Sequence, residues 1–237
     1  MTSAVEGTGP AFSFAGGRLT VPMSLAIKRV MDFPAETLDL YDFAGGSGWN
    51  VVDGSDIGRL IASGMVGFAQ SVAGALVKGG ANAPWHGVPV DGRLEDAVPG
   101  DALETGGVAL YDHFYFIFGV GWAIASKLLH LKRPAFFPIV DSYVAGLYFP
   151  VASILAGSRN PQVRFYWQAI RNDLVTSGQS AAINVLRANL AASSDPRVRR
   201  RATLSALRLR DILMWMSGPG AASVGIPPAG QISPLPR

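Results

Sequence analysis

The sequence contains no cysteine among its 237 residues. Disulfide bonds, thiolate zinc sites, iron–sulfur clusters and a cysteine nucleophile are therefore excluded. Histidine is almost as scarce, since only three residues occur, scattered at positions 86, 113 and 130. So few and so widely spaced ligands argue against a histidine-rich metal site. We therefore predict neither a metal nor a cofactor.

Charged residues are also few, at 16% of the chain, whereas hydrophobic residues make up 49%. This balance is too apolar for an intrinsically disordered protein, and the length suits one domain. The charge is unevenly spread, because residues 1–118 hold 6 Lys and Arg against 13 Asp and Glu, while residues 119–237 hold 14 against 4. The basic second half predicts an anionic partner such as nucleic acid; the alternative is that its arginine-rich helices simply face solvent.

Two uncharged segments, Leu60–Val77 and Ser142–Ser158, need to be checked against a membrane span. Both are at the short end for crossing a bilayer, and the second contains Pro150. Residues 2–20 lack the basic start and apolar stretch of a signal peptide. We expect a cytoplasmic monomer that does not bind membranes. A membrane-associated protein built around Leu60–Val77 is a third hypothesis beside the two given below.

The spacing of apolar residues predicts an all-α fold. Helical periodicity recurs through residues 21–217, which we interpret as one helical domain. Residues 1–20 are expected to form a flexible, glycine-rich leader, and residues 218–237 a disordered tail rich in Pro and Gly. Residues 78–107 are also rich in Gly and Pro, which predicts a long loop before a helix that begins near Val108.

The most informative segment is Phe118–Val144, where Gly119-Val120-Gly121 separates two helical runs. Two glycines around one small residue permit a tight turn that exposes backbone N–H groups at the start of the next helix. Such a place can bind phosphate. We expect Gly119, Val120, Gly121 and Trp122 to contact a nucleic-acid backbone. The alternative is that the glycines only let two helices cross closely.

Basic residues further along the same helix are candidates for neighbouring phosphates. They are Lys127, Lys132 and Arg133, the last two at the predicted end of the helix before Pro134. A second basic group lies in the C-terminal third and could contact DNA or face solvent. Its members are Arg197, Arg199, Arg200, Arg201, Arg208 and Arg210, and Asp211 could pair with them.

This segment resembles the core of the helix-hairpin-helix DNA glycosylase superfamily. The family signature is a leucine-proline-glycine-valine-glycine hairpin, an alanine-containing helix and a proline-x-x-aspartate turn. Here Ile117–Gly121, Ala125-Ser126 and Pro138–Asp141 follow in that order. Phe118 replaces the hairpin proline. The flanking segments YWQAIRNDL and LRLRDILMWM also look like an uncharacterised bacterial domain family that shares this core.

The resemblance implies double-stranded DNA as partner and Asp141 as the catalytic carboxylate. Ala123 stands where bifunctional members carry a Schiff-base lysine, so the expected activity is that of a monofunctional DNA glycosylase. Such an enzyme hydrolyses the N-glycosidic bond of a damaged or modified base. One alternative is that Asp141 only caps the helix that begins at Ser142. The protein would then be a non-catalytic DNA-binding module in which hairpin and arginine group together hold a duplex.

A glycosylase needs an aromatic pocket for the extruded base. Candidates for this pocket are Trp122, Tyr143, Tyr111 and Trp49, among which the sequence does not choose. The aromatic run before the hairpin is more consistent with the hydrophobic core. It comprises Phe114, Tyr115, Phe116 and Phe118.

Overall fold

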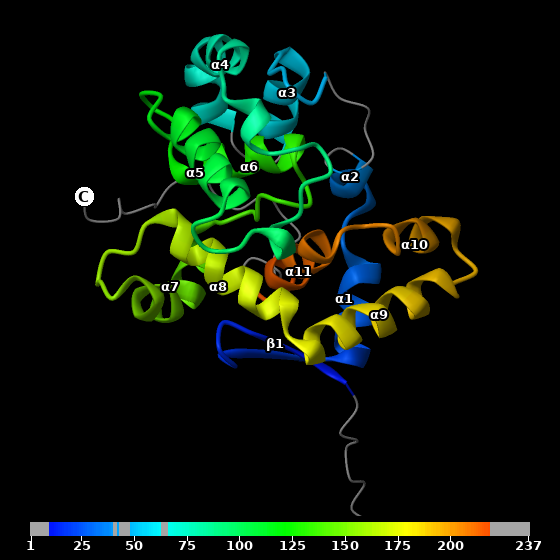
Figure 1. Ribbon diagram of the computed structural model, residues 1–237. Helices are drawn as coiled ribbons and strands as arrows, with labels where there is room; N and C mark the ends of the chain where they lie inside the picture. Colours follow the sequence, from blue (N-terminus) through cyan, green and yellow to red (C-terminus); the bar gives the residue numbers. More distant parts are fainter. Residues whose placement is uncertain (1–9, 40–41, 43–47, 63–65, 219–237) are drawn as a thin grey trace, which may run out of the picture.

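The computed structural model describes residues 10–39, 42, 48–62 and 66–218. Within these ranges the chain is mostly helical, which confirms the predicted all-α class (Figure 1). The elements are β1 (Ala11–Phe14), β2 (Leu19–Pro22), α1 (Met23–Asp32), α2 (Ala35–Leu38), α3 (Gly54–Ala62), α4 (Val66–Ala81), the 3-10 turns η2 (Trp85–Gly87) and η3 (Leu94–Asp96), α5 (Ala102–Tyr115), α6 (Trp122–Lys132), α7 (Ser142–Ala156), α8 (Val163–Val175), α9 (Ser177–Ala191), α10 (Pro196–Arg201) and α11 (Ala206–Trp215).

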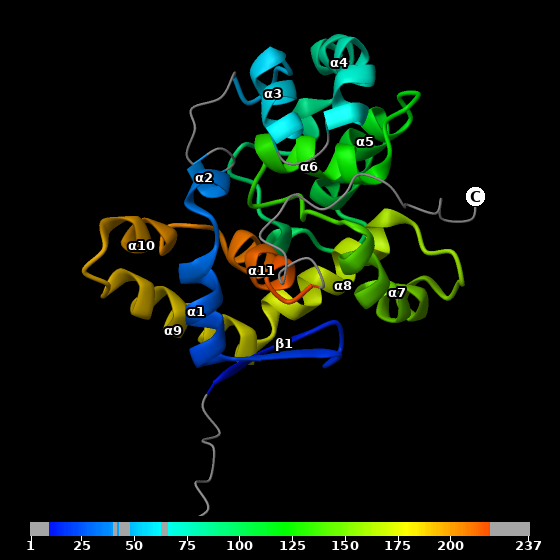
Figure 2. The same ribbon diagram turned by 180° about the vertical axis from the view of Figure 1, so that it is seen from behind.

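The last helix, α11, lies at the centre of the molecule. Residues 206–214 of this helix are all buried, including its charged side chains. In both views α11 runs between the group α3–α6 and the group formed by α7, α8 and the β-hairpin (Figures 1 and 2). A C-terminal segment therefore organises the core, and the elements on each side of it pack against a mainly apolar helix that carries three buried charged side chains.

A two-stranded antiparallel hairpin occupies residues 11–22, where the sequence predicts a flexible leader as far as residue 20. That prediction is wrong for this part, because Phe12 and Phe14 point from alternate positions into the core. The turn is formed by Ala15, Gly16 and Gly17, all with positive φ. Residues 1–9 and 219–237, the remainder of the predicted leader and nearly all of the predicted tail, lie outside the described residues.

Two side chains of α8 and α9 fix the β-hairpin. Asp173 accepts the backbone N–H of Ala15 over 2.8 Å. Gln179 bonds both backbone groups of Ser13, accepting its N–H and donating to its carbonyl over 3.1 and 2.8 Å. Hydrogen bonds to backbone hold the strand more specifically than apolar contact alone, and a composition rich in Gly and Phe gives no sign of them.

Helix α5 begins at Ala102, six residues before the predicted start near Val108. Its first turn is a reciprocal cap. Asp101 accepts the N–H of Glu104 over 2.7 Å, and Glu104 accepts the N–H of Gly100 over 2.6 Å. The Asp-x-x-Glu spacing is a known helix-start signal, which the glycines at 106 and 107 obscure. Gly107 is needed there, because a Cβ would lie 2.4 Å from the Phe136 ring.

Among the described residues, no helix combines the length and the apolar character needed to cross a membrane. The uncharged segment 142–158 forms α7, which contains Pro150 and ends at Gly157 with a left-handed φ of 60°. Residues 63–65 of the other uncharged segment lie outside the described residues.

Candidate nucleic-acid interface

The turn between α5 and α6 has the geometry that its two glycines predict. Gly119 has φ of +85°, a conformation that residues with a Cβ rarely adopt. The N–H of Val120 bonds to the carbonyl of Ile117 over 2.9 Å and closes the turn. Gly121 is the N-cap of α6, and among the described residues no side chain caps the start of this helix. The first backbone N–H groups of α6 therefore follow directly after a solvent-exposed glycine.

Apolar contacts with α4 hold the turn in place. A Cβ on Gly79 would come within 2.8 Å of the Ile117 side chain, and a Cβ on Gly119 within 2.8 Å of Val72. Val120 is buried as well. The turn is therefore anchored by Ile117 and Val120, and its geometry does not depend on solvent-exposed contacts.

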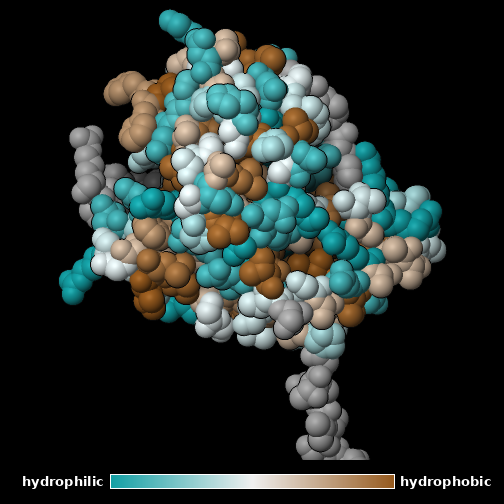
Figure 3. All heavy atoms as spheres, in the orientation of Figure 1, coloured by the Kyte–Doolittle hydropathy of each residue, from teal (hydrophilic) through white to brown (hydrophobic). Residues whose placement is uncertain are grey.

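Two aromatic residues of the turn face solvent. Phe118 is 98% exposed and Phe116 is 76% exposed, whereas Phe114, one turn earlier on α5, is fully buried. The expectation that the whole aromatic run joins the core is thus wrong for Phe116 and Phe118, and also for Tyr115, which is 41% exposed. The physical reason is the anchoring of Ile117, which directs both of its neighbours outward. In the space-filling view, hydrophobic side chains project from the surface at the α5–α6 turn (Figure 3).

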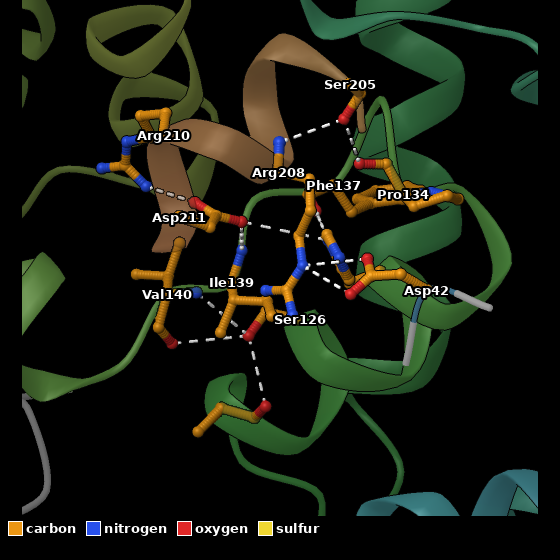
Figure 4. A network of polar contacts seen from close by, with 12 residues as sticks. Asp42, Ser126, Pro134, Phe137, Ile139, Val140, Ser205, Arg208, Arg210 and Asp211 are labelled. Carbon is orange, nitrogen blue, oxygen red and sulfur yellow. Dashed lines mark hydrogen bonds and ion pairs between the residues drawn. The ribbon is translucent and has the colours of Figure 1, made fainter. Parts of the chain in front are cut away.

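Residues 134–141 connect α6 to α7 and run beside α11. Figure 4 shows that side chains of α6 and α11 hold this segment through its backbone. His130 bonds to the Phe137 carbonyl over 2.8 Å, and Asp211 accepts the N–H of Ile139 over 3.0 Å. The Ser126 hydroxyl lies 3.4 Å from both the N and the O of Val140. These contacts place Asp141, the next residue, beside the middle of α6.

The Asp141 side chain caps α7. Its Oδ1 accepts the backbone N–H of Val144 over 2.8 Å, and the residue is partly exposed. Burial lowers the pKa of Lys127 on α6, while the charge of Asp141 opposes this shift, so the two groups lie within electrostatic reach. The structure therefore brings the turn, Lys127 and Asp141 together along one helix. The capping role is observed, and it occupies one of the two carboxylate oxygens in a bond to the protein.

Lys132 and Arg133 do not face solvent, which corrects their expected role as phosphate ligands. Lys132 is 2% exposed and donates to Asp56 of α3 over 2.6 Å. Arg133 is 1% exposed and donates to the carbonyls of Val88 and Trp49, both over 2.8 Å. Lys132 and Arg133 thus connect the end of α6 to α3 and to the loops that contain Trp49 and Val88. The sequence did not indicate this, because their partners lie 45 to 84 residues away.

The four candidate pocket aromatics are not gathered into one cavity. Tyr111 is buried edge-to-face against Trp167, and Trp122 packs edge-to-face against Tyr166. Tyr143 donates its hydroxyl to the Ser217 carbonyl over 3.3 Å. Trp49 is 51% exposed beside Arg133. Neither the cavity beside Phe136 and Trp167 nor the cavity beside Leu38 and Arg200 is lined by Asp141 or by any of these four.

The arginine group divides into buried and exposed members. Arg208 pairs with Asp42 over 2.9 Å and Arg210 with Asp211 over 2.6 Å, both inside the core. Arg201 donates to the carbonyls of Val30 and Met31 at the end of α1. These three are structural, and the pairing suggested for Asp211 is confirmed.

The exposed members are Arg197, Arg199 and Arg200 on α10. Figures 1 and 2 both place α10 on the opposite flank of the molecule from the α5–α6 turn. The turn and the arginine group therefore do not line one continuous groove, which corrects the expectation that they hold a duplex together. Within the described residues, no group of three or more His, Asp or Glu side chains is arranged to hold a metal ion.

The comparisons with curated proteins and with solved structures gave no match. The model of one protein family, described as a family of unknown function (DUF6308), matches residues 80–218. The matched segment runs from the end of α4 through α11, and so includes the α5–α6 turn, Asp141 and the buried pair Arg210–Asp211. Because it spans more than half of the sequence, the chain belongs to this family.

Proposed function

We propose that the protein binds double-stranded DNA through the α5–α6 turn, in the manner of a helix-hairpin-helix motif. The observation that carries the proposal is the start of α6, where an exposed glycine N-cap leaves the first N–H groups without a side-chain cap. A helix N-terminus with free N–H groups attracts an anion by hydrogen bonding and by its dipole. A cytoplasmic, monomeric protein is part of the proposal.

The N-cap residue offers a sharp test. Gly121 has φ of −85°, and a Cβ there would meet no atom within 4 Å, so aspartate fits at this position. Gly121→Asp supplies a good N-cap and is expected to keep or raise the stability of the fold. The aspartate carboxylate would also accept hydrogen bonds from the first N–H groups of α6, and it would add a negative charge where a phosphate would bind. Binding and stability should therefore change in opposite directions.

The measurement is a DNA titration at several salt concentrations with the wild-type protein and Gly121→Asp. The matched control is Gly178→Asp, which adds the same charge to the first turn of α9, again at an exposed glycine with open space around its Cβ. The proposal expects binding that weakens with salt, a loss of about tenfold or more in Gly121→Asp, and little change in Gly178→Asp. Equal affinity for the two variants would contradict it.

A second candidate function is N-glycosidic bond hydrolysis by Asp141. It is favoured by the position of this partly exposed carboxylate beside the helix that starts at the turn, with Lys127 in electrostatic reach. A carboxylate near the sugar would stabilise the positive charge that develops when the base leaves, and would orient the attacking water. Asp141 lines neither the cavity beside Phe136 and Trp167 nor the cavity beside Leu38 and Arg200.

The variant Asp141→Asn separates this activity from capping, because asparagine caps a helix about as well as aspartate. Release of free base from duplexes that contain alkylated or deaminated bases is the readout. The glycosylase proposal expects release by the wild-type protein and none by Asp141→Asn at unchanged DNA affinity. If both proteins bind DNA but neither releases free base, the glycosylase proposal is contradicted and the protein is a non-catalytic DNA-binding module.

A further inference from the structure

The exposed tip of the α5–α6 turn consists of Phe116 and Phe118. Phe118 is the most exposed large hydrophobic side chain among the described residues, at 98%. Phe116 is 76% exposed and ranks third, after Ile154. Phe116 is supported from one side by an edge-to-face contact with Tyr115 at 5.3 Å between ring centroids. Phe118 has no ring contact within the described part of the chain. An aromatic ring held entirely in water has its whole face available to a ligand.

The fold presents these rings on a rigid base. Ile117, between them in sequence, packs against Gly79 of α4, and Val120 is buried behind the turn. The backbone of the turn is closed by bonds from Ile117 to Phe114 and from Val120 to Ile117, over 3.1 and 2.9 Å. Anchored neighbours keep the two phenyl rings outside, so that their exposure follows from packing.

The group next to the rings has the opposite chemistry. Gly121 lies three residues after Phe118 and is the uncapped N-cap of α6. The tip thus combines flat apolar faces with neighbouring backbone N–H donors that favour an anion. A nucleotide has both complementary parts, a flat base and a phosphate. A flat apolar protein surface would match the rings and would leave the donors without an acceptor.

From this juxtaposition we infer that the tip binds an unpaired nucleobase, with Phe118 stacked on the base while the start of α6 holds the adjoining phosphate. The inference rests on the proposed function and narrows its substrate to DNA with an unstacked base, such as a gap, a bulge or a single strand. In a paired duplex both faces of a base are covered by its neighbours, so that Phe118 would have to separate two stacked pairs.

The test uses the full chain and three labelled probes of one sequence: a paired duplex, the same duplex with a single-nucleotide bulge, and the single strand. The variants are Phe118→Ala, Phe118→Trp and the control Ile154→Ala, which removes an 81% exposed apolar side chain from α7. Affinities come from fluorescence anisotropy. A fluorescent adenine analogue at the bulge reports stacking directly, because its emission falls when it stacks on a ring.

We expect the wild-type protein to prefer the bulged and single-stranded probes. Phe118→Ala should lose about tenfold affinity for these two probes, as for one base–aromatic stack, and lose much less on the paired duplex. Phe118→Trp should restore the affinity and the quenching of the analogue, and Ile154→Ala should match the wild type.

The outcomes that overturn the inference are distinct from those that overturn DNA binding. If the wild type binds all three probes and Phe118→Ala binds them equally well, the turn contacts DNA without stacking and only the inference fails. Equal loss on all three probes likewise contradicts stacking on an unpaired base. If the wild type binds none of the probes at low salt, the proposed function fails. Sedimentation with anionic phospholipid vesicles that depends on Phe118, without DNA binding, would identify the tip as a lipid contact and overturn both.

Discussion

The carboxylate of Asp211 accepts the backbone N–H of Ile139 over 3.0 Å and pairs with Arg210 over 2.6 Å. Through this bond the central helix α11 fixes the extended segment that ends at Asp141 (Figure 4). Asp211 is 5% exposed and Arg210 is 2% exposed, so that neither charge is solvated by water. The candidate site is thus positioned by an ion pair in the core.

Removing one member of this pair is expected to destabilise the protein strongly. Asp211→Ala leaves the buried Arg210 cation without its carboxylate and the Ile139 N–H without an acceptor, at a cost of about 3–5 kcal/mol in unfolding free energy. The double variant Arg210→Met/Asp211→Leu removes both charges and should cost less than Asp211→Ala. Urea denaturation followed by circular dichroism measures both. A double variant that is less stable than the single variant would contradict this account of the pair.

Acidification should destabilise the protein through His130. Burial, with the nearby Arg208 charge adding to it, lowers the pKa of His130 from 6.5 to about 3, although its bond to the Phe137 carbonyl and the Asp211 carboxylate 3.9 Å away favour the proton. Between these two pH values the unfolded chain binds a proton that the native protein does not bind. The contribution of His130 to stability is therefore complete above about pH 6.5 and falls by up to about 1.4 kcal/mol per unit as the pH decreases toward 3.

The control for this pH dependence is His130→Asn, whose amide can donate to the same carbonyl without titrating. Urea midpoints measured between pH 7 and 4 should show a shallower loss for His130→Asn than for the wild type. Parallel curves would mean that His130 does not contribute, and that carboxyl groups alone account for the acid sensitivity.

Capping by Asp141 has a separate and smaller effect. Asp141→Ala removes the acceptor of the Val144 N–H and should cost about 1 kcal/mol, whereas Asp141→Asn should stay within a few tenths of the wild type. Asp195, which caps α10 through Arg197, gives a matched Asp→Ala comparison away from the candidate site. Thermal unfolding measures all three. A loss in Asp141→Asn as large as in Asp141→Ala would show that the negative charge, rather than the cap, stabilises the fold.

Lys132 distinguishes a structural cation from a phosphate ligand. Because it is paired with Asp56 in the core, Lys132→Met should lower the unfolding free energy by about 3–5 kcal/mol. Lys28→Met removes an exposed partner of Asp32 and should cost less than about 1 kcal/mol. We expect the remaining folded fraction of Lys132→Met to bind DNA with unchanged affinity. A stable variant with weakened DNA binding would instead restore Lys132 to the interface.

The sequence by itself determined the helical class and the main features of the α5–α6 turn. Apolar periodicity predicts helices because a buried face recurs with the helical repeat, and this signal is local. Gly119 predicts a tight turn because few other residues adopt a positive φ, and Asp141 predicts a helix start because its side chain can accept an N–H three residues later. Each of these inferences concerns residues within a few positions of one another.

Only the tertiary structure decided which side chains of this segment are free to act. The residue types of Lys132 and Arg133 do not reveal whether these side chains are exposed. In the structure, partners distant in sequence bury both in the core. Phe116 and Phe118 look like core residues, but the packing of Ile117 against α4 turns them outward. Exposure is a property of the whole packing arrangement, because it depends on which distant segment covers a residue, and no local pattern of residue types carries that information.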